Sequence, residues 1–116
     1  MSKTTIYHNP RCSKSRQTLE LLDTHGIEAN VVEYLKTPPN AEQLAEILNL
    51  LNMEPRELMR TNESEYKDNS LDDPGLSREQ LIQAMVDHPG LIQRPIVLNK
   101  GKAALGRPPE NVLEIL

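Results

Sequence analysis

The fold is decided by residues 4–34, TTIYHNPRCSKSRQTLELLDTHGIEANVVEY. A short β-prone run from Thr4 to Tyr7 is ended by His8-Asn9-Pro10, because proline lacks a donor and restricts the residue before it. A helical pattern follows Cys12, and Ala29–Tyr34 then has the composition of a second strand. Because a whole helix separates the two strands, we expect them to lie parallel, as in a β-α-β unit.

The helix expected after the cysteine has recognisable ends. Ser13 or Ser15 can act as its N-cap, and Gly26 stands where a left-handed C-terminal cap is common. Between these ends, Leu19 and Leu22 fall on one face of the helix. The pattern therefore predicts an amphipathic helix that begins next to the cysteine.

The middle of the chain predicts a block of helices. Asn40 fits the N-cap of a helix from Ala41 to about Leu51, and a shorter helix starts at Pro55, since proline suits the first helical turn. Residues 61–75 are polar and end in a cluster of turn residues. The run Ser77-Arg78-Glu79-Gln80 has the form of a capping box and opens another helix.

The C-terminal part predicts two further strands, residues 95–98 and 102–105, with a tight turn between them and a short helix after Pro108-Pro109. The order β-α-β, helices, β-β-α is that of a four-stranded mixed sheet flanked by helices, with a helical insertion between the second and third strands. We therefore expect an α/β protein of thioredoxin-like layout, with one domain over residues 1–116.

Composition excludes several classes of protein. Phe and Trp are absent and only three Tyr are present, so there is little to stack on nucleic-acid bases. No apolar run approaches the roughly 20 residues of a membrane span, and the N-terminal residues lack the apolar core of a signal peptide. We expect a cytoplasmic monomer that binds neither nucleic acid nor membrane.

Cysteine and histidine usage also limits the chemistry. One cysteine cannot form an internal disulfide, and three scattered histidines beside it give no metal-ligand spacing. We therefore expect no metal site.

The net charge of −4 hides two basic ends. Residues 1–19 carry four bases and no acid, residues 20–90 carry fifteen acids and five bases, and residues 91–116 carry four bases and two acids. The bases of the first segment are Lys3, Arg11, Lys14 and Arg16. A chain that is acidic on average can therefore still bind an anion at its ends.

Cys12 is the candidate nucleophile. A thiol between a strand and the first turn of a helix faces unsatisfied N–H groups and the positive end of the helix dipole, which favour the thiolate. An ordinary thiol is about 3% ionised at pH 7, and a pKa lower by roughly two units makes it mostly thiolate. The bases Arg11, Lys14 and Arg16, together with His8, act in the same direction. A lone cysteine is commonly a buried, inert residue, but Arg and Ser neighbours favour a reactive one here.

Such a thiol can attack a disulfide, a phosphate ester or another tetrahedral oxyanion. Ser15 stands where a CxxC pair has its second cysteine, so a resolving thiol must come from another molecule. Cysteine-dependent phosphatases carry an arginine six residues after the cysteine, and Thr18 occupies that position. Guanidinium groups bind tetrahedral oxyanions through two donors, which makes Arg60, Arg94 and Arg107 candidates for an anion site.

Four separated motifs resemble those of the glutaredoxin-dependent arsenate reductase family. They are HNPRCSKSR at residues 8–16, ELMR at 57–60, RPIV at 94–97 and ALGRPPE at 104–110, in order over nearly the whole chain. The resemblance implies a thioredoxin-like fold with a helical insertion and reduction of arsenate to arsenite in arsenic detoxification. It also implies glutathione as co-substrate, glutaredoxin as partner and no tightly bound cofactor.

The resemblance also implies roles for individual residues. In that family the cysteine matching Cys12 is the nucleophile, and the histidine matching His8 helps to lower the pKa of the thiol. Three arginines hold the arsenic oxyanion, and the proline after the second of them is cis. The candidate site residues are therefore Cys12, His8 and Ser15 as catalytic residues, Arg60, Arg94 and Arg107 as substrate-binding residues, and Pro95 as the cis-proline.

Two other functions stay open. Regulators of the same fold family bind RNA polymerase without catalysis, but they generally carry a CxxC switch, and Ser15 counts against one here. A glutathione-linked thiol-disulfide transferase would use Cys12 but would leave the three arginines without an assigned role.

Overall fold

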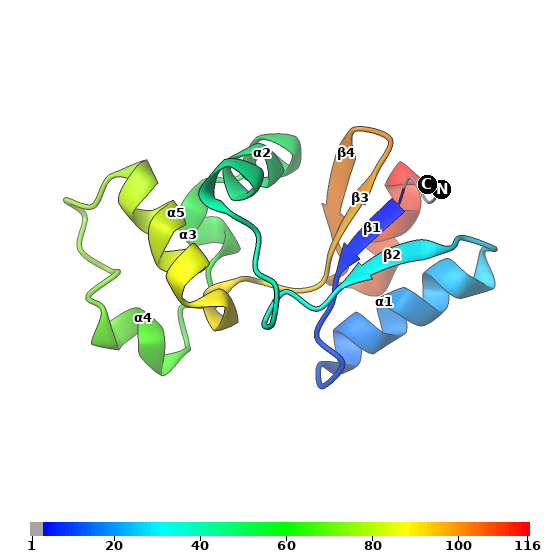
Figure 1. Cartoon of the computed structure of the whole chain (residues 1–116), viewed down its shortest axis with the longest axis horizontal. Helices are drawn as coiled ribbons and strands as arrows, with labels where there is room; N and C mark the ends of the chain where they lie inside the picture. The colour runs from blue at the N-terminus through cyan, green and yellow to red at the C-terminus, as the bar shows by residue number, and fades with distance from the viewer. Residues whose placement is uncertain (1–3) are drawn as a thin grey trace. The chain divides into compact units, whose positions relative to one another are not determined.

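The computed structural model describes residues 4–116, so Lys3, counted above among the basic residues, lies outside the described residues. The chain divides into two compact units (Figure 1). One combines the residues up to Thr37 with Arg94–Leu116, and the other is Pro38–Gln93. The second unit contains the predicted helical insertion, and our prediction of a single domain stays a prediction.

The first unit is built on a four-stranded mixed sheet of order β2-β1-β3-β4. Its strands are β1 (Thr4–Tyr7), β2 (Ala29–Val32), β3 (Ile96–Asn99) and β4 (Lys102–Leu105). β1 runs parallel to β2 and antiparallel to β3, with Ile6 opposite both Val31 and Val97, and β3 and β4 form an antiparallel hairpin (Figure 1). The predicted sheet is thus confirmed.

β2 is shorter than the sequence predicts. It ends at Val32 instead of Tyr34, because the next residues form a turn in which the N–H groups of Lys36 and Thr37 donate to the carbonyl oxygen of Glu33, at 2.9 and 3.0 Å. The backbone there bonds within the turn and does not continue the ladder with β1.

The β3–β4 hairpin also differs by one residue from the prediction. β3 begins at Ile96, after Pro95, and includes Asn99. The turn consists of Lys100 and Gly101, which both have positive φ angles, 52° and 77°. This is the backbone that a two-residue turn needs in order to match the twist of its strands.

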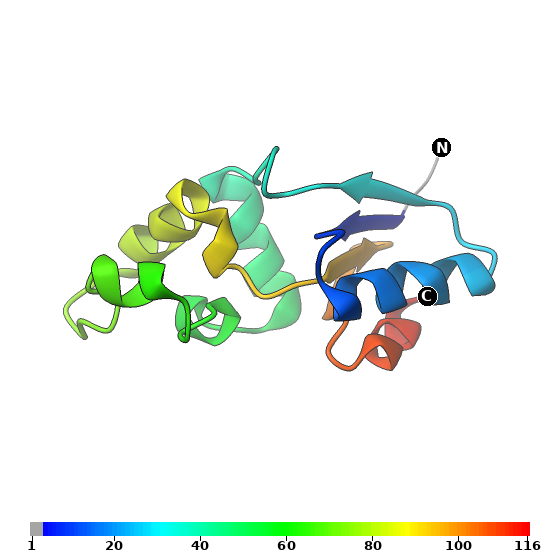
Figure 2. The same cartoon turned by 90° about the horizontal axis from the view of Figure 1, so that it is seen from below.

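Two helical segments cover one face of this sheet (Figure 2). They are α1 (Ser13–Thr24) and the 3-10 helix η2 (Pro109–Ile115), which is the short helix predicted after Pro108-Pro109. The core between them consists of one fully buried side chain from each of β1, α1, β3 and η2, namely Ile6, Leu22, Val97 and Val112. Burial of each such side chain contributes about 1.5–3 kcal/mol, so this cluster fixes α1 on the sheet.

The second unit is helical. Its elements are α2 (Ala41–Leu51), α3 (Pro55–Leu58), α4 (Ser64–Asp68), α5 (Arg78–Asp87) and the 3-10 turn η1 (Pro89–Leu91). The capping boxes of Asn40 with Gln43 and of Ser77 with Gln80 are present, which confirms the starts predicted for α2 and α5. α4 was not predicted, and none of its residues is buried, so the sequence offers no apolar pattern from which to recognise it.

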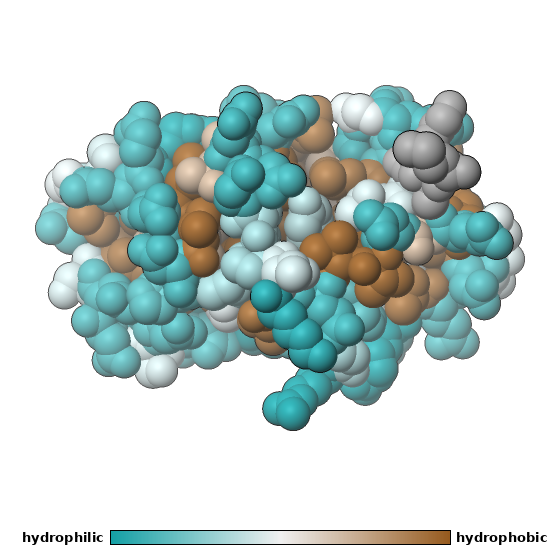
Figure 3. Space-filling model, in the orientation of Figure 1, coloured by the Kyte–Doolittle hydropathy of each residue, from teal (hydrophilic) through white to brown (hydrophobic). Residues whose placement is uncertain are grey.

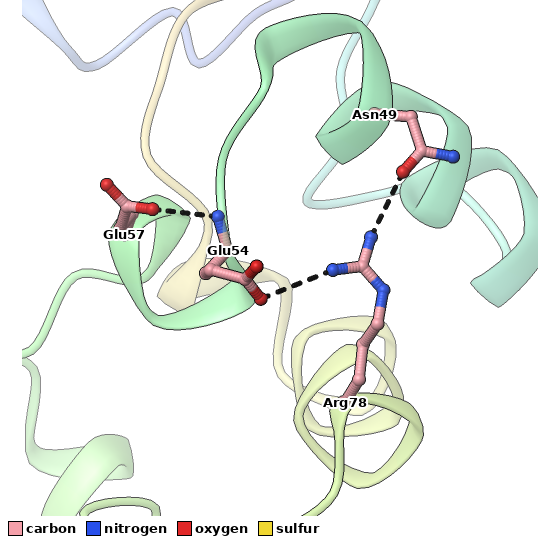
Figure 4. Close-up of polar contacts among 4 residues, drawn as sticks. All are labelled: Asn49, Glu54, Glu57 and Arg78. Carbon is pink, nitrogen blue, oxygen red and sulfur yellow. Dashed lines mark hydrogen bonds and ion pairs between the residues drawn. The ribbon is translucent and has the colours of Figure 1, made fainter.

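Arg78 at the start of α5 connects three helices of this unit (Figure 4). Its guanidinium donates to Oδ1 of Asn49 on α2 at 3.3 Å and lies 3.5 Å from Oε2 of Glu54, which precedes α3. The N–H of Glu54 in turn donates to Oε1 of Glu57 at 2.9 Å. Partly exposed pairs of this kind each contribute about 0.2–1 kcal/mol, so the network mainly fixes how these helix ends meet.

On the face drawn in Figure 3, apolar side chains are interspersed with hydrophilic ones. Within residues 4–116, the longest and most apolar helices still fall short of what is needed to cross a membrane.

Candidate functional site

Cys12 lies where the chain leaves the sheet and enters α1. It is the N-cap residue of that helix, with an extended backbone at φ −91° and ψ 123°. Its N–H donates to the carbonyl oxygen of Asn9 at 3.0 Å, and its own carbonyl accepts from the N–H of Arg16 at 3.0 Å. The expectation that Ser13 or Ser15 caps the helix was therefore wrong, because the turn closed by Asn9 places the cysteine at that position and both serines lie inside α1.

The surroundings of Cys12 favour the thiolate. Partial burial opposes ionisation, but the N–H of Ser15, the guanidinium of Arg94 and the N–H of Lys14 outweigh it and hold the pKa of the Cys12 thiol below its ordinary value. Both N–H groups belong to the first turn of α1, where the positive end of the helix dipole also favours a thiolate.

Arg94 and Arg107 come together in the same unit as Cys12. Arg94 directly precedes β3, and the peptide bond from Arg94 to Pro95 is cis. Nη1 of Arg107, which follows β4, donates to the carbonyl oxygen of Arg94 at 3.0 Å. The structure thus places one candidate arginine beside the thiol and a second in contact with the backbone of the first.

Arg60 belongs to the helical unit, between α3 and α4. Its N–H donates to the carbonyl oxygen of Leu91 at 2.7 Å, next to an antiparallel bridge between Met59 and Ile92. Its Nη1 lies 2.8 Å from Oε1 of Glu63. Arg60 therefore forms an ion pair with a carboxylate of the same unit.

His8 and Ser15 are buried together behind the loop that carries the cysteine. Nδ1 of His8 lies 2.7 Å from the Ser15 hydroxyl, which also accepts from the N–H of Asn9 at 3.0 Å. Burial lowers the pKa of His8, partly opposed by Glu33 and assisted by Arg16. The neutral imidazole is therefore favoured, and its expected influence on the pKa of the thiol stays a prediction.

The chain matches the sequence model of the ArsC family over residues 7–115, a span that includes Cys12 and all three candidate arginines. This chain belongs to the ArsC family. It is similar to the uncharacterized protein YfgD of Escherichia coli K12, with 59% identity over 112 residues, which cover 96% of this chain and 94% of that protein. It is 50% identical over 117 residues to an arsenate reductase of Neisseria meningitidis serogroup A, and the match covers all of both chains.

Solved structures agree with these relatives. The arsenate reductase from Vibrio cholerae is 51% identical to this chain and superposes with a TM-score of 0.95 over 97% of each chain. The likeness confirms the predicted resemblance to arsenate reductases and the predicted thioredoxin-like fold.

Asn9, which the sequence predicts only as part of the run that ends the first strand, also shapes the site of this ArsC-family chain. Its Oδ1 accepts from the N–H of Arg11 at 3.0 Å, and its carbonyl oxygen accepts from the N–H of Cys12. These bonds close a tight turn that presents the cysteine to the start of α1. The Asn-Pro dipeptide, which favours turns, is the sequence signal that could have identified it.

Gly106 is a second residue that shapes the site and that the sequence did not predict. Its N–H donates to the carbonyl oxygen of Pro95 at 2.9 Å, and a Cβ atom at this position would overlap Oγ1 of Thr18 and lie 2.7 Å from Cγ of Pro95. The absence of a side chain therefore lets the end of β4 approach α1 closely and fixes the backbone that leads to Arg107. In the sequence, the only signal is a glycine next to a candidate arginine.

Between Thr4 and Leu116, no group of three or more His, Cys, Asp or Glu residues is placed to hold a metal ion.

Proposed function

We propose that this chain reduces arsenate to arsenite through a covalent adduct on Cys12, with electrons from glutathione and glutaredoxin. The observation that carries the proposal is the partly buried thiol at the start of α1, whose pKa is lowered by backbone N–H groups and by Arg94. The similar proteins from Neisseria meningitidis and Vibrio cholerae, both named arsenate reductases, support arsenate as the substrate.

The first step is attack by the Cys12 thiolate on arsenic. A sulfur–arsenic bond forms, an arsenic–oxygen bond breaks, and the oxygen leaves as water after it takes up protons, so arsenic stays in its +5 state. Guanidinium groups near the thiol stabilise the negative charge that moves among the arsenic oxygens. Arg94 is suited to this role because its charge already acts on the sulfur.

The reduction follows with two external thiols. Glutathione adds to arsenic through its sulfur and displaces a second water. A glutaredoxin thiolate then attacks that glutathione sulfur, a mixed disulfide leaves, and the electron pair of the broken arsenic–sulfur bond reduces arsenic to its +3 state. Water hydrolyses the remaining bond to Cys12, which releases arsenite and restores the thiol.

The cysteine content of the chain supports this use of external thiols. Cys12 is the single cysteine of the sequence, and the position three residues later is the fully buried Ser15. A resolving thiol must therefore come from another molecule.

A coupled assay tests the proposal. NADPH oxidation is followed in the presence of glutathione, glutathione reductase and glutaredoxin, with and without arsenate, and arsenite is measured as the product. We expect arsenate-dependent oxidation that Cys12→Ser abolishes while its circular dichroism spectrum is unchanged. Turnover that is retained in Cys12→Ser, or that requires a mixed disulfide and ignores arsenate, would contradict the proposal. The second result would favour a thiol-disulfide transferase.

A further inference from the structure

A cavity beside the cysteine loop lies within the sheet unit. Its volume is about 270 Å³, and its walls come from the loop between β1 and α1 and from the turn after β2. The loop supplies Pro10 and Arg11, and the turn supplies Glu33, Leu35 and Lys36. Because Cys12 directly follows Arg11, a ligand in this cavity lies next to the segment that carries the nucleophile.

Hydrogen bonds hold both walls of the cavity. The N–H of His8 donates to the carbonyl oxygen of Val32 at 2.8 Å, which joins the start of the loop to the end of β2. The carbonyl oxygen of Pro10 accepts from Nη1 of Arg16 at 2.9 Å, which ties the loop to α1. The turn after β2 is closed by the hydrogen bonds described above. The cavity is therefore formed before a ligand arrives, which lowers the cost of binding.

The charges of the cavity consist of two bases and one acid. Nζ of Lys36 lies 3.7 Å from Oε1 of Glu33, and the two side chains are 79% and 44% exposed, so the pair is open to solvent. Arg11 is exposed, and within residues 4–116 its guanidinium forms no ion pair with a carboxylate. The cavity thus offers one adjacent pair of opposite charges and one unpaired cation.

Apolar side chains accompany these charges. Pro10 is exposed, and the side chain of Leu35 is among the most exposed large apolar groups of the described residues, at 49%. A small inorganic oxyanion has no apolar part with which to cover them. Apolar groups combined with a few placed charges are typical of a site for an organic ligand, and here they favour a small charged peptide.

We propose that this cavity binds glutathione and presents its thiol to the arsenic on Cys12. The inference rests on the proposed function, in which glutathione supplies the second thiol. The γ-glutamyl end of glutathione carries an ammonium and a carboxylate on one carbon, which complement the adjacent Glu33 and Lys36. The glycine end carries a second carboxylate, which the guanidinium of Arg11 can bind through two donors. The middle of the tripeptide then lies over the apolar side chains.

An NMR titration tests this binding without turnover. The isotope-labelled full-length protein is titrated with S-methylglutathione, whose capped sulfur cannot form an adduct with Cys12. We expect the backbone amide signals of Arg11, Leu35 and Lys36 to shift with one common dissociation constant. An absence of shifts at these three positions would overturn the inference.

Variants test the part that each charge plays. Lys36→Gln and Arg11→Gln should each weaken the binding of S-methylglutathione about 1.5- to 5-fold, which is the strength of a partly exposed ion pair. Lys102→Gln is the matched control and should bind like the wild type, because Lys102 is exposed on β4, at the other edge of the same sheet. Equal affinities of the wild type, Lys36→Gln and Arg11→Gln would overturn the inference.

An ester of the ligand separates the two basic residues. Ethyl esterification of the glycine carboxylate removes the group assigned to Arg11, so it should weaken binding to the wild type and to Lys36→Gln but not to Arg11→Gln. An ester effect of wild-type size in Arg11→Gln would contradict the placement of the glycine end and overturn the inference.

The titration contains no arsenate, so it can fail independently of the proposed function. Glutathione binding in the cavity without arsenate-dependent NADPH oxidation would contradict the proposed function but not the binding site, and it would favour a thiol-disulfide transferase. Arsenate reduction without amide shifts at the cavity would leave the proposed function standing and overturn this inference.

Discussion

Nη1 of Arg107 donates a 3.0 Å hydrogen bond to the carbonyl oxygen of Arg94. The guanidinium of Arg94 acts in turn on Cys12 and lowers the pKa of its thiol. Arg107 therefore holds the backbone from which the activating charge extends. The sequence suggests both arginines only as oxyanion ligands. In the structure, Arg107 instead bonds the backbone of Arg94, and Arg94 acts on the thiol.

From this relationship we expect Arg107→Ala to raise the pKa of Cys12 even when no arsenate is present. A higher pKa leaves less thiolate at pH 7, so alkylation by iodoacetamide should slow at pH 7 and approach the wild-type rate near pH 10. Arg94→Ala should cause the larger change, because it removes the charge itself. An Arg107→Ala protein with weaker arsenate binding but an unaltered thiol pKa would show that Arg107 contacts only the substrate.

Ser15→Ala should destabilise the protein, because the hydroxyl of this fully buried residue is bonded to both His8 and Asn9. Leaving the N–H of Asn9 unsatisfied in the interior costs about 1–3 kcal/mol in the free energy of unfolding. Urea denaturation measures this change. Ser13→Ala, at an exposed position of the same helix, is the control and should stay within about 0.5 kcal/mol of the wild type. Similar losses for the two variants would contradict the role given to the buried hydroxyl.

Gly106→Ala tests the close approach of β4 to α1. The added methyl group would collide with Thr18 and with Pro95, which forces a shift at the segment that leads to Arg107. We expect a loss of about 1–3 kcal/mol in the free energy of unfolding, as for other overpacked sites, and weaker arsenate reduction. Gly75→Ala is the matched control, because Gly75 is exposed and its nearest neighbour is the flexible side chain of Asp73. A Gly106→Ala protein as stable as this control would disprove the steric argument.

The buried His8 should make stability depend on pH. Because burial lowers the pKa of His8, the unfolded chain takes up a proton on this imidazole at higher pH than the folded chain does. The free energy of unfolding should therefore fall as the pH decreases from about 6.5, the ordinary histidine value, through the lower folded value. Urea unfolding between pH 5 and pH 7 should show a weaker dependence in His8→Gln than in the wild type. Equal slopes for His8→Gln and the wild type would rule out His8 as the source.

Local signals in the sequence were enough to predict most of the fold. The capping boxes that begin at Asn40 and Ser77 identify their helices because each residue pair satisfies N–H groups within one turn. The strands and the β-α-β order follow from alternating apolar residues and turn residues. α4 was missed because it buries no side chain, and the end of β2 was misplaced because the turn at Glu33 has no glycine or proline to mark it.

The site could be predicted only in part. Cys12 is evident from its place between a strand and a basic helix start, whereas its action as N-cap depends on the turn that Asn9 closes. The contact of Arg107 with Arg94 joins residues 13 positions apart on different sides of a hairpin, and no local pattern encodes it. The Arg60–Glu63 ion pair could have been predicted from the sequence, because a spacing of three residues commonly brings such side chains together on a turn or helix.

The burial of Ser15 bears on where the reducing equivalents of the reaction come from. A resolving thiol three residues after Cys12 would occupy the position of Ser15. This residue is buried, and its hydroxyl is bonded to both His8 and Asn9. The molecule therefore has no internal dithiol couple in which to store an oxidising equivalent between cycles. Under the proposed function, the number of catalytic cycles is therefore limited by the supply of reduced external thiols, because the protein has no dithiol couple of its own.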